Sequence, residues 1–332
     1  MTVVVLLLVL LPAFVGLLPW AAWWAMRRSR RDGVDFPDLA ALRTAGRVDT
    51  VVLDRWGTVT TGELVVTDID PVEEGNERNL KWFAAALQHA VEGDPVARAI
   101  ARLAGPGKLT DVELVAGRGT SGAVDRHPVR VGAPAWLGME TRDGLGETVG
   151  VEVDHRPFGY LTVSDQVRPD APLAVARLRA AGVEPILLSD ADVLDTEHLA
   201  QACGIDKWIR GEEAAEREQA VRDQRGGAHC VAVVARGQDN AEILASADLA
   251  FSEAGRGVRM VDLDVQRVAR ALEVARGIPS ASLRVRATGL VASGIGGSWG
   301  LVDGLSLVAA GAVLVVGCLA VVTVAWSAGR RA

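Results

Sequence analysis

Lysine, tyrosine and cysteine are scarce in this chain of 332 residues. Its three lysines are Lys81, Lys108 and Lys207, so 32 of the 35 basic residues are arginines. The three cysteines form no Cys-x-x-Cys pair and no even framework, which argues against disulfide staples and a structural zinc site. A net charge of −7 gives no reason to expect a nucleic-acid partner. The chain is too apolar, at 49%, for a disordered tail, and it is long enough for one large or two ordinary domains.

Charged residues are also missing from both ends of the chain. None occurs from Thr2 to Met26, a length that crosses about 30 Å of hydrocarbon as a helix. Three tryptophans and then four arginines mark its C-terminal end: Trp20, Trp23, Trp24, Arg27, Arg28, Arg30 and Arg31. A secretory signal would carry its positive charge before the apolar run. This run therefore predicts a retained anchor whose C-terminal side faces the cytoplasm.

The second uncharged region lies near the C-terminus. Residues 305–326 form an apolar run, and residues 287–302 form a shorter, glycine-rich run, with Asp303 between them. As a hairpin, the two runs keep their flanking arginines in the cytoplasm; alternatively, the shorter run lies in the interface or re-enters. We expect a multi-pass protein of the cell membrane with residues 32–283 in the cytoplasm.

The middle of the chain alternates between strand-like and helix-like stretches. Apolar runs predict buried strands at 51–53, 186–188 and 231–234, and helices are predicted at 171–181, 193–203 and 212–224. This rhythm is typical of an α/β fold with a parallel sheet, in which ligands bind at the carboxyl ends of the strands.

One region interrupts this rhythm. Residues 66–160 hold a helix-like stretch, 79–104, followed by short glycine-rich strands. They predict an α+β subdomain inserted between the first strand and the rest of the sheet.

A carboxylate directly follows the first predicted strand, in the stretch Asp54-Arg55-Trp56-Gly57-Thr58-Val59-Thr60. On a turn opened by glycine, it suits a nucleophile that attacks phosphorus and forms an acyl-phosphate. The stretch resembles the phosphorylation motif of P-type cation-transporting ATPases, Asp-Lys-Thr-Gly-Thr-Leu-Thr.

The resemblance extends over roughly residues 40–275. Further matching segments occur in the family's order: Asp165 to Pro169, Leu188-Ser189-Asp190, Gly204-Ile205, and Val234 to Asn240 with the following Ala245 to Asp248. Within the insert, the Gly-x-Gly-x-x-Gly sequence of residues 117–122 resembles the nucleotide loop of the heavy-metal (CPx) branch, although the motif alone is weak and also fits a plain turn.

The resemblance implies a haloacid-dehalogenase-like (Rossmann-like) phosphorylation domain with an inserted nucleotide-binding-like domain and transmembrane helices. It divides the chain into an anchor and basic flank (1–31), the two parts of the phosphorylation-like domain (32–65 and 161–283), the insert (66–160) and a C-terminal hairpin (284–332). It also implies ATP and Mg²⁺ as cofactors.

Carried over position by position, the resemblance implies the site residues. The catalytic candidates are Asp54, Thr58, Ser189, Arg217 and Asp239. The nucleotide-binding candidates are Asp94, Gly117, Gly119 and Gly122. The metal candidates are Asp54 and Asp239.

The departures from the family fall on the chemistry. Arg55 and Trp56 stand where the family has lysine and threonine, and arginine lacks the point geometry of an ammonium. Arg236 aligns with a magnesium-site aspartate, although a hard cation needs clustered carboxylates. We hypothesise that Arg236 pairs with Asp54 in place of the metal; the alternative is that it points into solvent. Arg217 either replaces the family's phosphate-binding lysine or is a solvated helix residue.

Two further departures concern the insert and the membrane part. Asp94 takes the place of an adenine-side histidine. Leu11-Pro12-Ala13 keeps the proline of the family's Cys-Pro-Cys metal motif without its sulfur ligands. The family's earlier membrane helices and actuator domain have no counterpart in this sequence, so we expect a truncated, degenerate member.

Three functions follow from these observations. The first is a partner-binding or regulatory pseudo-ATPase that is inactive as an autonomous ion pump. The second is a cation pump, whole or as part of a split assembly, that forms an aspartyl-phosphate at Asp54. The third is a haloacid-dehalogenase-like phosphatase, which needs an acid where Trp56 stands. The partners expected are the membrane and another membrane protein or pump subunit, and no nucleic acid.

Overall fold

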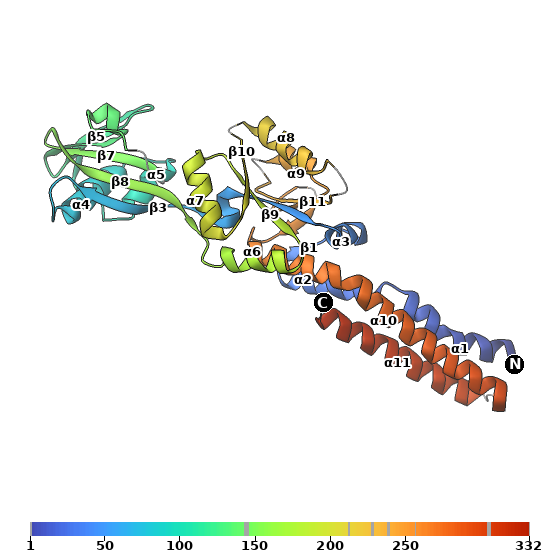
Figure 1. Cartoon of the computed structure of the whole chain (residues 1–332). Helices are drawn as coiled ribbons and strands as arrows, with labels where there is room; N and C mark the ends of the chain where they lie inside the picture. The colour runs from blue at the N-terminus through green and yellow to red at the C-terminus, as the bar shows by residue number, and fades with distance from the viewer. Residues whose placement is uncertain are drawn as a thin grey trace. The chain divides into compact units, whose positions relative to one another are not determined.

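The computed structural model describes residues 2–142, 146–211, 213–226, 229–237, 240–255, 257–303 and 307–331. The chain forms two compact units (Figure 1). The first consists of Met1–Leu53, Leu173–Ile186 and Glu213–Ala332, and the second of Asp54–Pro172 and Leu187–Glu212. The five-segment division expected from the sequence stays a prediction.

A seven-stranded sheet has the order β1-β13-β12-β11-β2-β9-β10. Its strands are β1 (Val34–Asp35), β2 (Thr50–Asp54), β9 (Glu184–Ser189), β10 (Lys207–Arg210), β11 (Val231–Val234), β12 (Leu249–Ser252) and β13 (Val258–Met260). Strand β11 pairs in parallel with β2 and β12, and β12 with β13; β1 is antiparallel to β13. All residues of β2 and β11 are buried, as expected for central parallel strands. The predicted parallel α/β sheet is confirmed.

Helices connect these strands. They are α3 (Leu39–Ala45), α6 (Ala171–Ala180), α7 (Val193–Cys203), α8 (Ala214–Gln224) and α9 (Ala241–Ser246). Helix α7 shows why its bounds could be predicted. The Asp192 carboxylate accepts a hydrogen bond from the Asp195 amide at its start, and Gly204 ends it in the left-handed conformation at φ +71°.

A six-stranded antiparallel sheet has the order β3-β8-β7-β6-β5-β4 (Figure 1). Its strands are β3 (Thr60–Pro71), β4 (Leu109–Val115), β5 (Gly119–Val124), β6 (His127–Gly132), β7 (Glu147–Val153) and β8 (Arg156–Val167). Helices α4 (Glu77–Gln88) and α5 (Pro95–Ala101) pack on it through a core that includes Leu80, Leu87, Ile100 and Leu161.

The stretch 79–104, expected to be helical throughout, is two helices. Gly93 adopts φ +84°, the Asp94 side chain caps α5, and Pro95 is its first residue. A proline has no amide proton to continue the preceding helix, so the break follows from the local sequence.

Four helices form a bundle within the first unit. They are α1 (Thr2–Leu17), α2 (Trp20–Arg31), α10 (Val265–Asp303) and α11 (Leu307–Arg331), and α1 packs against both α10 and α11 (Figure 1). The uncharged run 2–26 is therefore not one helix. It breaks before Trp20, since Pro19 cannot donate the next helical hydrogen bond and disfavours a helical residue before it.

Among the described helices, one is long and apolar enough to cross a membrane. It covers Val308–Ser327, with a mean hydropathy of 2.6, and only 22% of its most apolar window is buried inside the protein. The predicted run 305–326 falls largely on it. The run 287–302 is the last part of the 39-residue helix α10, and the multi-pass arrangement stays a prediction.

Candidate functional site

The predicted nucleophile lies at the end of a buried strand. Asp54 is the last residue of β2 and is 6% exposed, and its Oδ1 accepts the Arg55 amide at 3.0 Å. Gly57 follows at φ +72°, a conformation that favours glycine and turns the chain into a tight loop. Thr58, predicted as catalytic, is fully buried, and its hydroxyl has no hydrogen-bond partner among the described residues.

Asp165 of β8 and Arg168, just after β8, hold this loop in its conformation by hydrogen bonds. The Arg168 guanidinium donates to the carbonyls of Gly57 at 3.2 Å and Thr60 at 3.0 Å. The Asp165 carboxylate accepts from the Thr60 hydroxyl and, at 3.1 Å, from the Gly62 amide. Burial raises the pKa of Asp165 above its usual range, against the lowering effect of these donors. The sequence identified the segment from Asp165 to Pro169 as a motif, but it did not predict that this segment holds the loop after Asp54.

Arg55 and Trp56 fill the two positions that depart from the family motif. The Arg55 Nε lies 3.2 Å from the Asp190 carboxylate, with the arginine side chain 23% exposed. Its guanidinium carbon lies 5.9 Å from the centroid of the Trp56 ring. Arg55 is therefore held by a carboxylate from the loop after β9 and flanked by a bulky indole.

Ser189 ends β9 and is fully buried. Its Oγ accepts the Ala191 amide at 3.1 Å and the Thr196 hydroxyl at 2.9 Å. A serine hydroxyl has one proton to donate as well. The predicted role of Ser189 as a donor to a phosphoryl oxygen is chemically compatible with this geometry.

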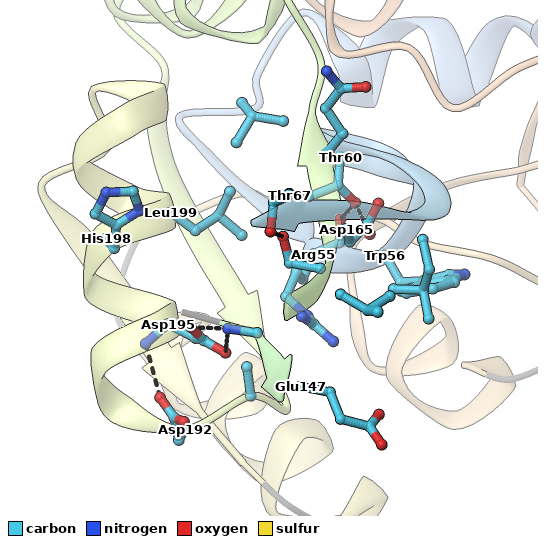
Figure 2. Close-up of a pocket in the computed structure, with 17 residues that line it drawn as sticks. Arg55, Trp56, Thr60, Thr67, Glu147, Asp165, Asp192, Asp195, His198 and Leu199 are labelled. Carbon is cyan, nitrogen blue, oxygen red and sulfur yellow. Dashed lines mark hydrogen bonds between the residues drawn. The ribbon is translucent and has the colours of Figure 1, made fainter. Parts of the chain in front are cut away.

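A cavity of about 580 Å³ adjoins the loop. Figure 2 shows the Arg55 side chain extending into it, with Asp195 and Glu147 on either side. Its wall holds four carboxylates, those of Glu147, Asp165, Asp192 and Asp195.

Burial raises the pKa values of Glu147 and Asp195, and the latter accepts the Gly146 amide at 3.0 Å. No sequence signal places Glu147 here, because it comes from the insert. Arg55 is the one arginine or lysine in the described wall, so the cavity carries an excess of negative charge.

A second cavity, of about 370 Å³, lies within the insert. Asp94, Gly117 and Gly119 line it, which brings together three of the four predicted nucleotide-binding residues. Gly122 is not among its described lining residues. A Cβ there would lie 2.9 Å from the Leu87 side chain, so a glycine at this position allows Leu87 to pack against the strand.

The predicted nucleotide-binding residues also have local structural roles. Gly117 turns the chain between β4 and β5 at φ +68°. A Cβ on Gly119 would lie 2.2 Å from the Val131 carbonyl oxygen. The Asp94 Oδ1 accepts the Val96 amide at 2.8 Å as the cap of α5. Both the plain-turn and the nucleotide-loop interpretations therefore stay open.

The remaining site predictions are not tested. Arg217 lies half-buried on α8, in the unit that does not contain Asp54. Asp239 lies outside the described residues, and the pairing of Arg236 with Asp54 stays a prediction. The described residues contain no group of three or more His, Cys, Asp or Glu side chains able to hold a metal ion.

A comparison with protein families settles the class of the soluble part. The family model described as haloacid dehalogenase-like hydrolase matches residues 48–234, more than half of the chain. The chain belongs to the haloacid dehalogenase-like hydrolase family. This match confirms the predicted fold class, and β2 with Asp54 lies near its start.

Curated relatives are cation-transporting ATPases. The chain is 32% identical over 264 residues to the "Copper-exporting P-type ATPase" of Mycobacterium tuberculosis, covering 76% of this chain and 35% of that protein. It is 31% identical over 298 residues to "Cation-transporting P-type ATPase B" of Mycobacterium bovis, covering 81% of this chain and 40% of that protein. The predicted resemblance to P-type ATPases is confirmed, and the chain spans about two fifths or less of these two relatives.

Solved structures share the fold. A zinc-transporting PIB-type ATPase in its E2.Pi state superposes with a TM-score of 0.79 at 22% identity, over 96% of this chain and 55% of that chain. The catalytic domain of the CPx-ATPase CopB-B gives 0.62 at 17% identity, over 75% of this chain and 98% of that domain. These likenesses show that the chain shares the fold of these structures.

Proposed function

We propose that this chain is a membrane-bound pseudo-ATPase that keeps the fold of a cation-transporting P-type ATPase without pumping on its own. The observation that carries this proposal is the Arg55–Asp190 pair at 3.2 Å, directly beside Asp54. A guanidinium held by a carboxylate is a planar, fixed cation, unlike the mobile ammonium that the family uses at this position.

The charge of the adjoining cavity supports the same conclusion. Four carboxylates line the 580 Å³ cavity that also contains Arg55, Trp56 and Thr60. A triphosphate that entered this cavity beside the loop after Asp54 would meet like charge in a partly desolvated place, where repulsion is screened less than in water.

The role proposed for the protein is to act through a membrane partner. The helix over Val308–Ser327 anchors it, and most of that helix's apolar surface is unburied in this chain alone. With α1 and the end of α10 also crossing, residues 32–283 would lie in the cytoplasm by the distribution of arginines. The partner is another membrane protein or a pump subunit.

One observation favours a second candidate, phosphoryl transfer to Asp54 in a reduced or split cation pump that uses ATP and Mg²⁺. The Thr58 hydroxyl is buried without a partner in the described chain, which is uncommon in native structures and fits a missing acceptor such as a phosphoryl oxygen. In that reaction an Asp54 oxygen would attack the γ-phosphorus, and ADP would leave. A phosphatase role has less support, since Trp56 replaces the acid that would protonate the leaving group.

Labelling with ATP separates the two candidates. The full chain in mild detergent is incubated with γ-labelled ATP and Mg²⁺, quenched with acid and assayed for acid-stable label, with Asp54→Asn as the control. We expect wild type and control to carry the same background. Label that disappears in Asp54→Asn would overturn the pseudo-ATPase proposal. Recovery from native membranes without any companion protein would contradict the partner role.

A further inference from the structure

One face of α2 combines two apolar side chains with three arginines. Trp23, Met26, Arg27, Arg30 and Arg31 follow the spacing i, i+3, i+4, i+7 and i+8, which places them on one side of the helix. Together they line a surface pocket of about 490 Å³. The Arg27 guanidinium carbon lies 5.3 Å from the centroid of the Trp23 ring. The pocket is apolar towards the start of α2 and cationic towards its end.

The opposite face of α2 is packed inside the helix bundle. Ala21 and Ala25 are at most 3% exposed, and Trp24 packs against a buried cluster that contains Ala325 of α11. Ala325 lies near the end of the apolar segment Val308–Ser327. This packing puts Trp24 beside the C-terminal part of the segment, towards one edge of the hydrocarbon layer that the segment would span.

The depth of the arginines follows from helix geometry. They lie three to seven residues beyond Trp24, which is about 5–10 Å farther along the helix axis. The headgroup layer is about 5–8 Å thick on each side of the hydrocarbon. Arg27 therefore lies within the headgroup layer and Arg31 at its outer edge, where a flexible arginine side chain can reach back to the lipid phosphates, with Trp23 and Met26 at the boundary below them.

Two of these arginines keep their charge uncompensated within the described chain. Arg30 pairs with Asp35 at 2.7 Å, whereas no ion pair joins Arg27 or Arg31 to a carboxylate in the described ranges. Basic residues in a last helical turn complement the helix dipole, and the positive-inside rule accounts for their sign. Neither rule accounts for a pocket that joins them to Trp23 and Met26.

We propose that this α2 pocket binds the headgroup of an anionic phospholipid in the cytoplasmic leaflet. Arg27 and Arg31 donate hydrogen bonds to the phosphate oxygens, and the first part of an acyl chain lies along Trp23 and Met26. Guanidinium groups suit phosphate because they offer parallel donors, and clustered arginines beside a membrane helix favour anionic over zwitterionic lipid.

The test measures lipid retained by the full chain. Protein purified in mild detergent is equilibrated with equal amounts of phosphatidylglycerol and phosphatidylcholine, and bound lipids are counted by native mass spectrometry. At about 5-fold per arginine, the double change Arg27→Gln with Arg31→Gln should lower the preference for phosphatidylglycerol about 30-fold. The matched control removes two exposed arginines of α10, Arg284→Gln with Arg286→Gln, and should retain the preference.

Three results would overturn the proposal. The first is equal retention of the two lipids by wild type, a result that needs no variant to be folded. The second is an equal loss in the α10 control, which would indicate general surface charge. The third is displacement of the lipid by millimolar inorganic phosphate or glycerol 3-phosphate, which would make this a site for soluble phosphate. Arg27→Lys with Arg31→Lys should keep most of the preference.

Discussion

Two threonines in the loop after β2 should respond to the same substitution with opposite signs. Thr58 and Thr60 are both at most 1% exposed. The Thr58 hydroxyl has no partner among the described residues. The Thr60 hydroxyl donates to the Asp165 carboxylate, lies 2.7 Å from the Arg55 carbonyl oxygen and accepts the Gly57 amide at 3.2 Å. Valine has nearly the shape of threonine and removes only the hydroxyl.

The magnitudes follow from these contacts. An unpaired buried hydroxyl costs about 1–3 kcal/mol, so Thr58→Val should raise the free energy of unfolding by about 1 kcal/mol. Thr60→Val removes a hydrogen bond to a charged group, worth about 1.5–3 kcal/mol, and leaves buried partners unpaired, so about 3 kcal/mol should be lost. At about 2–4 °C per kcal/mol, the two variants should melt on opposite sides of wild type.

Thermal unfolding in detergent, followed by tryptophan emission, measures both variants under identical conditions. If Thr58→Val lowers the melting temperature as much as Thr60→Val, the Thr58 hydroxyl is bonded in the folded protein. The unpaired-hydroxyl argument, and with it the support for the second candidate function, would then be wrong.

Further predictions concern stability and pH. Gly119→Ala should cost about 3 kcal/mol or more in urea unfolding, because its Cβ would lie 2.2 Å from a carbonyl oxygen, whereas Gly117→Ala, with open space around it, should cost about 1 kcal/mol; equal costs would contradict the close approach. The pKa of Asp165 is raised from 3.8, so the folded state holds its proton more tightly than the unfolded state does. As pH rises from about 4, wild type should therefore lose stability relative to Asp165→Asn, and parallel pH profiles would refute this. Glu152→Gln should cost about 1–2 kcal/mol by chemical unfolding, since Glu152 is 6% exposed and pairs with Arg130, itself 35% exposed; an unchanged midpoint would count against a net gain from that pair.

Local signals account for the parts of the fold that could be predicted. The buried run of β2 and the position of Asp54 follow from apolar residues and the turn after them. The ends of α7 follow from Asp192 and Gly204. Long-range packing accounts for what was missed. The acidic cavity joins Glu147 of the insert to Asp195 of α7, residues that no spacing rule connects.

Hydropathy missed one helix break, and the glycine motif leaves two interpretations open. The uncharged run 2–26 predicted one helix, because hydropathy alone does not detect the helix break at Pro19. The glycine pattern at 117–122 suggested a ligand loop, yet Gly119 is also required by its approach to the backbone of β6, and Gly122 by packing. A glycine pattern indicates that another group lies close to the backbone, but it does not distinguish a ligand from a neighbouring strand or side chain.

Phosphoenzyme formation at Asp54 tests the central claim most directly. Wild type, Asp54→Asn and the double change Arg55→Lys with Trp56→Thr are incubated side by side with γ-labelled ATP and Mg²⁺, and acid-stable label is measured per mole of protein. The pseudo-ATPase account predicts that wild type does not exceed Asp54→Asn, and that any label gained by the double variant depends on Asp54. Label in wild type approaching one phosphate per chain, lost in Asp54→Asn, would contradict it.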